Sequence, residues 1–316
     1  MYNQMMLMES AQLRIYLSRV SYVDHAKCLF LIYNIVIETM SATAIDVAQV
    51  KVKINDQEDR KILDWLTPID YGPQQSDFLR RRQPGTGQWL LDSDEFKGWL
   101  STGNQTLFCP GIPGAGKTTL TSIVVDDLHS RFHDNPKTSI AHIYCNYQRK
   151  NEQKIEHLLA SVLKQLAGAQ YSLPGTIRDL YDRHKQKKTR PLCDEILGVL
   201  QSVVATCPRV FIIVDALDEC QTDEGCRARL VSELFRLQTR HSINIFATSR
   251  FIPEICDRFK DISSLSLEIR ASPDDVARYV QGHMSHLPSF VQRDKQLQEE
   301  ITTSISEAVD GMYVLS

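Results

Sequence analysis

Short apolar runs alternate with longer segments of helical periodicity along most of this chain, a pattern typical of strands separated by helices. The run Val210–Val214 has five apolar residues in succession, which suits a parallel strand that is covered on both faces. The pattern therefore predicts an α/β core. Its predicted strands are Thr106–Cys109, Ile140–Cys145, Val210–Val214, Ile243–Ala247 and an edge strand with alternating Leu265, Leu267 and Ile269.

Helices are predicted where apolar side chains recur every three or four residues. Ser272 precedes Pro273, Asp274 and Asp275, which is the arrangement of a capped helix start. The predicted helices of the core and of the region that follows it are 120–128, Ile155–Ala167, Ile196–Val204, Leu230–Leu237, Val276–His283 and Leu297–Val309.

Two regions precede the core. Residues 1–66 look helical, although alternating apolar residues at 50–54 leave the middle of this region ambiguous. Residues 67–100 carry turn signals and read as a linker and pre-core segment. Three consecutive arginines, Arg80–Arg82, could meet phosphates, but we interpret them as a solvated face. The predicted division is 1–66, 67–100, 101–271 and 272–316, the last being a partial helical lid.

Composition limits which partners the chain is expected to bind and in which cellular compartment it is expected to lie. The chain has 316 residues and a net charge of −3, so no global field favours nucleic acid or an anionic membrane. Its eight cysteines lack zinc-type spacing, which favours a reducing compartment. The longest apolar run, Cys28–Ile37, is much shorter than a membrane-spanning helix. We therefore expect a cytoplasmic protein that binds neither nucleic acid nor membrane.

The segment Gly111–Thr118 fits G-x-x-x-x-G-K-[ST], the phosphate-binding loop of nucleoside-triphosphate proteins. Glycines let the backbone approach phosphate oxygens, and the following helix presents its positive N-terminus to them. Lys117 supplies a mobile charge for the β- and γ-phosphates, and the Thr118 hydroxyl can ligate Mg²⁺. The predicted nucleotide-binding residues are Gly111, Ile112, Pro113, Gly114, Ala115, Gly116, Lys117, Thr118 and Thr119.

Acidic residues follow the buried strand Val210–Val214. Asp215 lies at its carboxyl end, where parallel sheets bind ligands, and can hold Mg²⁺ through water opposite Thr118. Asp218 or Glu219 could orient or activate an attacking water, although one of the two could equally cap the next helix. Arg250 ends another strand and could sense the γ-phosphate. The predicted catalytic residues are Asp218, Glu219 and Arg250, and the predicted metal ligands are Thr118 and Asp215.

These motifs together resemble the NACHT domain, a signal-transducing P-loop ATPase of the STAND class. The small Ala216 directly after Asp215 is a mark of that domain. The stretches Ile62–Leu66, Gly85–Leu91 and Leu107–Thr119 look like the nephrocystin-type NACHT proteins of filamentous fungi, which are NLR-like.

This resemblance implies several expectations about fold and function. It implies a five-stranded parallel sheet with the Arg250 strand between the phosphate-loop strand and the Asp215 strand. It also implies ATP or dATP as ligand, an ADP-bound closed state, and self-assembly of the ATP-bound state. By resemblance, Gly87–Trp89 approach the adenine and Arg250 senses the γ-phosphate.

The sequence stops at Ser316, where members of the family normally continue into a winged helix and sensor repeats. We therefore expect a truncated switch with slow hydrolysis that assembles with itself or acts on longer NACHT relatives. The alternative is a module that binds nucleotide without hydrolysing it. A P-loop GTPase is disfavoured because no guanine-reading N/TKxD motif occurs, and a P-loop kinase because no acceptor-substrate signature is visible.

Overall fold

The computed structural model describes residues 57–308, apart from 136, 150–152, 221–224 and 263. The helices predicted within residues 1–56 and the predicted helix end at Val309 lie outside the described residues. The chain divides into two compact units, Met1–Lys61 and Ile62–Ser316. Residues 57–61 of the first unit are helical, and so are residues 62–66 of the second. The second unit holds the sheet and all the predicted site residues.

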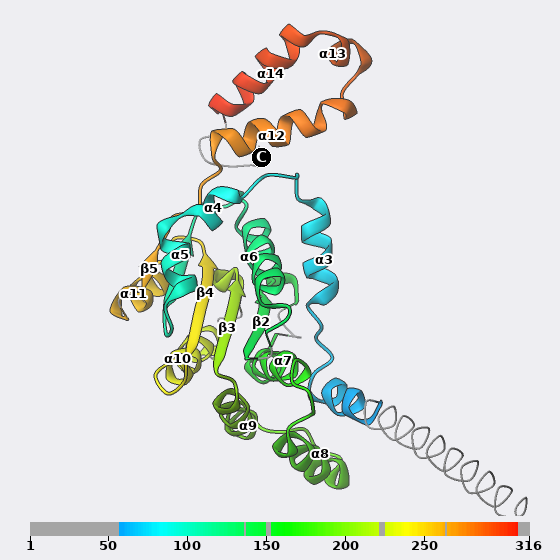
Figure 1. Ribbon diagram of the computed structural model, residues 1–316, viewed down its shortest axis with the longest axis vertical. Helices are drawn as coiled ribbons and strands as arrows, with labels where there is room; N and C mark the ends of the chain where they lie inside the picture. The colour runs from blue at the N-terminus through cyan, green and yellow to red at the C-terminus, as the bar shows by residue number, and fades with distance from the viewer. Residues whose placement is uncertain (1–56, 136, 150–152, 221–224, 263, 309–316) are drawn as a thin grey trace, which may run out of the picture. The chain divides into compact units, whose positions relative to one another are not determined.

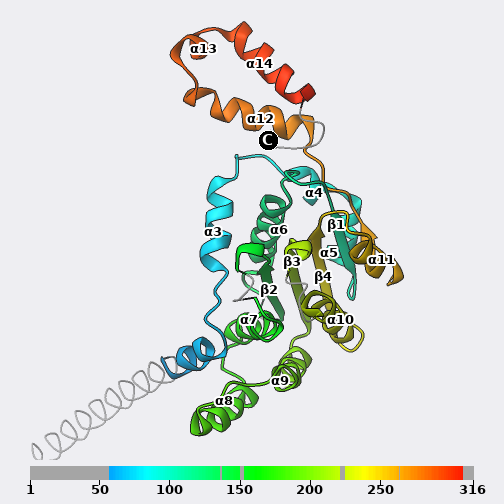
Figure 2. The same cartoon turned by 180° about the vertical axis from the view of Figure 1, so that it is seen from behind.

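Five parallel strands form one sheet in the order β2-β3-β4-β1-β5, whose strands are labelled across Figure 1 and Figure 2. The prediction of a five-stranded parallel α/β core is confirmed, and β4 lies between β1 and β3 as the resemblance implies. The edge strand is shorter than its alternating pattern suggested, with one further bridge from Ile269 to Gly111. The strands are β1 Thr106–Pro110, β2 Thr138–Tyr144, β3 Arg209–Asp215, β4 Ile243–Ser249 and β5 Leu265–Ser266.

Helices connect and flank these strands (Figure 2). Short 3-10 turns occur at η1 Tyr147–Arg149, η2 Leu217–Glu219 and η4 Met284–His286. None of the helices in the described ranges is long and apolar enough to cross a membrane. The α-helices are α3 Gly72–Arg81, α4 Gln88–Asp92, α5 Asp94–Ser101, α6 Lys117–Phe132, α7 Ile155–Gly168, α8 Gly175–Lys187, α9 Cys193–Thr206, α10 Cys226–Gln238, α11 Pro253–Asp261, α12 Pro273–His283, α13 Ser289–Arg293 and α14 Lys295–Ala308.

The core consists of two hydrophobic layers because neighbouring residues of a strand point to opposite faces of the sheet. On β3, Phe211 and Ile213 pack with α4, α5 and α6, while Ile212 and Val214 pack with α7, α9, α10 and α11. Trp99 of α5 is fully buried in the first layer, and its indole N–H donates to the Ile245 carbonyl at 2.9 Å. Burial on both faces holds the carboxyl ends of the strands in fixed positions for a site.

The segment before β1 is more regular than its turn signals suggested, since it forms α3, α4 and α5. Helix α3 fully buries none of its side chains, so its hydrophobic signal in the sequence is weak. The turn signals mark the helix ends. Gly85 and Gly87 have positive φ angles of 84° and 79°, and Ser93 caps α5 by accepting from the Phe96 amide at 3.2 Å.

Candidate functional site

The phosphate loop joins β1 to α6, as its sequence context requires. A Cβ on Gly111 would lie 2.5 Å from the Ile269 carbonyl oxygen, so the loop can form its bridge with Ile269 only with glycine there. Gly114 and Gly116 have φ angles of 76° and 84°, a region that side chains disfavour. These glycines turn the chain so that the N-terminus of α6, which begins at Lys117, opens toward the cavity described below.

Lys117 reaches back over the loop. Its Nζ donates to the carbonyl oxygens of Gly111 at 2.9 Å and Ile112 at 2.8 Å. Burial lowers the pKa of Lys117, and the carboxylates of Asp218 and Asp215 oppose that shift. The ammonium group therefore sits in a partly desolvated position, where its charge interacts strongly with an incoming anion.

Asp215 is the centre of a hydroxyl network. Its carboxylate is 1% exposed and accepts from Thr118 Oγ1, Thr121 Oγ1 and Thr248 Oγ1, each at 2.7 Å. Burial raises the pKa of Asp215, and the three hydroxyl donors counteract this rise. Thr248 Oγ1 also accepts from the Ala216 amide at 2.9 Å. The network ties the ends of β3 and β4 to the first turn of α6.

Thr118 and Asp215 fit a magnesium site. Mg²⁺ prefers oxygen ligands, keeps several waters and takes one or two carboxylates together with substrate phosphates. Thr118 Oγ1 lies 2.7 Å from Asp215 Oδ2, so the two oxygen groups face the same point beside the phosphate loop. The structure thus brings the two predicted metal ligands into contact, and their binding of Mg²⁺ stays a prediction.

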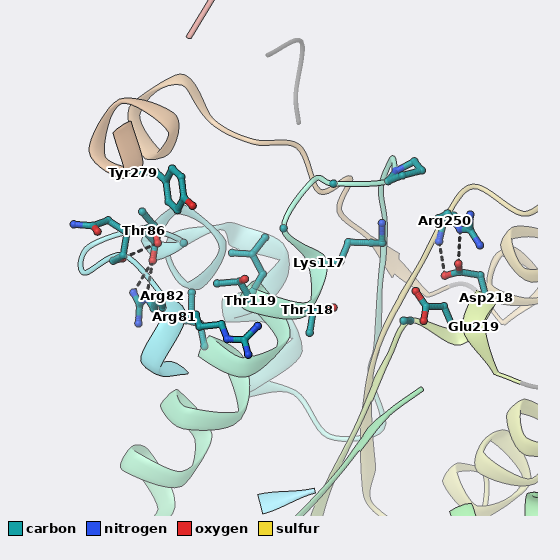
Figure 3. Close-up of a pocket in the computed structure, with 18 of the residues that line it drawn as sticks. Arg81, Arg82, Thr86, Lys117, Thr118, Thr119, Asp218, Glu219, Arg250 and Tyr279 are labelled. Carbon is teal, nitrogen blue, oxygen red and sulfur yellow. Dashed lines mark hydrogen bonds and ion pairs between the residues drawn. The ribbon is translucent and has the colours of Figure 1, made fainter. Parts of the chain in front are cut away.

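The acids of η2 have different partners. The Asp218 carboxylate accepts from the Arg250 amide at 2.9 Å and from Arg250 Nε at 2.5 Å (Figure 3). Within the part of the chain that the structure describes, Glu219 Oε2 accepts one bond, from the Tyr147 amide at 3.3 Å. Burial, with smaller contributions from Asp218 and Asp215, raises the pKa of Glu219. Asp218 therefore forms an ion pair with Arg250. The Glu219 carboxylate has a longer and weaker hydrogen bond, and it lines the cavity described next.

These groups border a cavity of about 550 Å³, large enough for a nucleotide. Figure 3 shows Lys117, Thr118 and Thr119 between the Arg250–Asp218 pair and the segment that carries Arg82 and Thr86. Ala115 is fully buried, and Gly111 and Ile112 do not line the cavity either. The lining consists of Arg81, Arg82, Gln83, Thr86, Gly87, Pro113, Gly114, Gly116, Lys117, Thr118, Thr119, Leu120, Ile123, Tyr147, Ala216, Asp218, Glu219, Arg250 and Tyr279.

Several of these residues were not predicted. Arg81 and Arg82 line the cavity although their run suggested a solvated face, and Thr86, Tyr147 and Tyr279 come from three further segments. Arg82 Nη2 and Nε donate to the Thr86 carbonyl at 2.6 and 3.0 Å. The only sequence signal was the charge of the arginine run, because the approach of α3 and α12 to the loop depends on packing.

Helix α12 contacts the same segment. Asp275 of α12 is buried, and its Oδ2 accepts from the Gly87 amide at 2.8 Å. Arg278 donates to the Gly85 carbonyl at 2.8 Å. A Cβ on Gly87 would lie 2.4 Å from Ile123 Cδ1, so glycine lets this segment pack directly on α6. Gly87, which the resemblance places near the adenine, therefore connects α12 with the floor of the cavity.

The sheet order, the phosphate loop between β1 and α6, and a carboxylate at the end of β3 define a P-loop NTPase. A family model described as "Nephrocystin 3, N-terminal" matches residues 85–250, more than half of the chain. The chain belongs to this nephrocystin-type family. No curated protein sequence matches the chain.

A comparison with solved structures finds distant matches. The Aeropyrum pernix ORC2 protein in ADPNP–ADP complexes shares 12% identity with a TM-score of 0.41, covering 72% of this chain and 55% of that one. The A. pernix ORC1 protein in complex with DNA shares 15% with a TM-score of 0.41, covering 79% and 64%. Domain III of Thermotoga maritima DnaA shares 13% with a TM-score of 0.38, covering 75% and 83%.

The chain thus spans about half of the ORC2 chain. At these scores the fold assignment depends on the sheet order and the phosphate loop rather than on the likeness itself. The DNA in the ORC1 complex belongs to that protein. That the present chain binds no nucleic acid remains a prediction.

Proposed function

We propose that this chain is a Mg²⁺-dependent, ATP- and ADP-binding switch of the NACHT type that hydrolyses ATP slowly. The observation that carries the proposal is the Asp215 network, in which one buried carboxylate accepts from Thr118, Thr121 and Thr248. It joins the phosphate loop to the strand that precedes Arg250. A bound triphosphate would therefore contact elements that this network joins.

The phosphate-binding roles follow from position. Lys117 and the open N-terminus of α6 attract the phosphates, and Thr118 with Asp215 would hold Mg²⁺. When bound, Mg²⁺ neutralises charge on the β- and γ-phosphates. Lys117 would exchange its two carbonyl partners for phosphate oxygens, because an anion compensates the charge of a partly desolvated ammonium better than neutral carbonyls do.

Glu219 is the residue we assign to the attacking water. Its carboxylate lines the cavity, and its bond from the Tyr147 amide is long at 3.3 Å, so the carboxylate can accept a proton from water. Asp218 would instead position Arg250, whose guanidinium could turn toward the terminal phosphate. The choice between the two acids, open in the sequence, is thus proposed in favour of Glu219.

The base of the nucleotide would lie away from the acids. Leu120 and Ile123 give the cavity an apolar floor, and Thr86 and Tyr279 stand beside it. Stacking on the ring of Tyr279 and contact with the apolar floor suit a purine. We also propose a cytoplasmic location and assembly with further copies or with longer NACHT relatives as the output of the switch.

The test is nucleotide binding and turnover by the purified chain. Mg²⁺-ATP is expected to bind, with Lys117→Ala losing binding and Lys260→Ala, an exposed lysine on α11, leaving it unchanged. Equal affinity in wild type and Lys117→Ala would refute the site. Phosphate release should be slow and absent in Glu219→Gln, with Glu254→Gln as the matched control.

A second candidate function, binding without turnover, has one observation in its favour. Two of the cations that line the cavity are already engaged, Arg250 with Asp218 and Lys117 with loop carbonyls. If wild type releases phosphate no faster than Lys117→Ala while still binding ATP, this second function holds. The nucleotide that co-purifies distinguishes them further, because ADP would indicate a site that has hydrolysed ATP.

A further inference from the structure

A second cavity, of about 320 Å³, adjoins the first on the side of α3 and the end of β2. It shares Arg81, Thr118, Thr119, Ala216 and Glu219 with the larger cavity. Asp215, Gln74, Phe78 and Tyr144 complete much of its wall. Arg81 thus stands where the two cavities meet, beside the groups to which we assign Mg²⁺ and the attacking water.

Helix α3 is fixed to the core at this place. Gln75 Nε2 donates to the Ser122 carbonyl of α6 at 2.9 Å, and its Oε1 accepts from the Tyr144 hydroxyl. The rings of Phe78 and Tyr144 meet edge to face at 4.9 Å. These contacts hold the helix against α6 and β2 one turn before Arg81.

Helical spacing explains why Arg81 faces the cavities. Residues three and four apart lie on the same side of a helix, so Gln74, Phe78 and Arg81 form one stripe. All three line the second cavity. Arg80 lies off this stripe, is 77% exposed and lines neither cavity. In Figure 3 the Arg81 side chain extends toward Thr118 and Thr119.

The four cations around the larger cavity are held with different strength. Lys117 binds two loop carbonyls, Arg250 binds the nearly buried Asp218, and Arg82 binds the Thr86 carbonyl. Arg81 pairs at 2.6 Å with Asp77 on its own helix, and its side chain is 75% exposed. Exposed pairs of this kind are weak, so this guanidinium can be drawn to a phosphate at little cost.

We propose that Arg81 binds the terminal phosphate of a bound triphosphate and makes the site prefer ATP over ADP. The proposal rests on the proposed function. The terminal phosphate is the one that lies next to the Mg²⁺ ligand and the attacking water, and Arg81 shares a cavity wall with Thr118, Asp215 and Glu219. A guanidinium suits this task because its planar donors pair with two phosphate oxygens at once.

The positive charge at the end of α3 also has a simpler explanation, and the test must distinguish phosphate binding from it. Basic residues in the last turn of a helix complement its dipole, and both Arg80 and Arg81 lie there. Arg80→Ala is therefore the matched control, since it removes the same charge from the same turn and also a contact to Asp77. Without nucleotide, the two variants should melt at the same temperature.

The experiment measures Mg²⁺-dependent affinity for ADP and for the β,γ-imido analogue of ATP, which is not hydrolysed. Arg81→Ala should weaken the ATP analogue about tenfold or more and leave ADP within about twofold, as expected for one charged hydrogen bond. Arg80→Ala should change neither, and Arg81→Lys should restore part of the preference.

Two results would overturn the proposed role of Arg81 and leave the proposed function standing. Arg81→Ala would lose affinity for both nucleotides equally, or its affinities would not differ from those of Arg80→Ala. The proposed function fails separately if Lys117→Ala binds both nucleotides as well as wild type does. If wild type binds neither nucleotide, both proposals are wrong.

Discussion

Asp218 holds Arg250 at two points, accepting from its backbone amide at 2.9 Å and from its Nε at 2.5 Å. The Asp218 side chain is 3% exposed and that of Arg250 is 50% exposed. An aspartate with both oxygens engaged in this way serves as an anchor for the arginine. This pairing distinguishes Asp218 from its neighbour Glu219, and it determines what each acid can do.

The pair predicts coupled effects on turnover. Asp218→Asn, Arg250→Ala and the double variant should each reduce ATP turnover, and the double variant should lose no more than the worse single variant. The reason is that Asp218 acts through Arg250, so removing both removes one function. Single-turnover phosphate release measures all three. Losses that multiply in the double variant would show that the two residues act independently.

Glu219 predicts how the rate depends on pH. Burial raises the pKa of its carboxyl above the ordinary value, so protonation extends to higher pH than for an exposed glutamate. A general base must be deprotonated, and turnover should therefore rise with pH through this raised pKa and then level off. Rates measured from acid to neutral pH should show this limb in wild type. If Glu219→Gln keeps a residual rate that rises with pH in the same way, Glu219 does not cause the pH dependence.

We expect the substitution Ala216→Gly to stabilise the folded chain. It has a φ angle of 52°, which costs an L-residue about 1 kcal/mol that glycine does not incur. Ala216→Gly should raise the free energy of unfolding by up to about 1 kcal/mol, offset in part by the greater freedom of the unfolded chain. Chemical denaturation measures the change. Ala247→Gly, at a buried position of β4, is the control and should destabilise the chain.

We expect the substitution Thr248→Val to destabilise the folded chain. Its buried hydroxyl donates to Asp215 and accepts from the Ala216 amide, so the isosteric Thr248→Val leaves two buried polar groups short of a partner. The expected cost is about 1–3 kcal/mol, measured by denaturation without nucleotide. Thr303→Val, at an exposed position of α14, should stay close to wild type. An equal effect at both positions would contradict a structural role for the network.

Much of the fold could be predicted because its signals are local. The apolar runs of β2, β3 and β4 and the glycines of the phosphate loop report backbone requirements that each segment carries in its own residues. Thr118 and Asp215 could be paired in advance because a phosphate loop and the end of a buried parallel strand meet at the same edge of a sheet.

The choice between Asp218 and Glu219 could not be made in this way. Both acids lie in one turn, and only the packing of β4 against β3 brings Arg250 to Asp218 rather than to Glu219. The edge strand is a similar case, because Leu265, Leu267 and Ile269 alternate although only Leu265–Ser266 forms a strand. The length of a strand depends on its hydrogen bonds to the neighbouring strand, and the alternation of its own residues does not predict that length.

The sequence by itself determined a parallel α/β core, a phosphate loop and an acidic strand end, because periodicity, glycine dihedrals and motif spacing act over a few residues. Only the tertiary structure decided which distant side chains complete the site. Arg81, Thr86 and Tyr279 belong to segments far apart in the sequence, and they line the cavity because Phe78, Gly87 and Asp275 pack α3 and α12 against the core. Such long-range contacts depend on the shape of the whole folded unit.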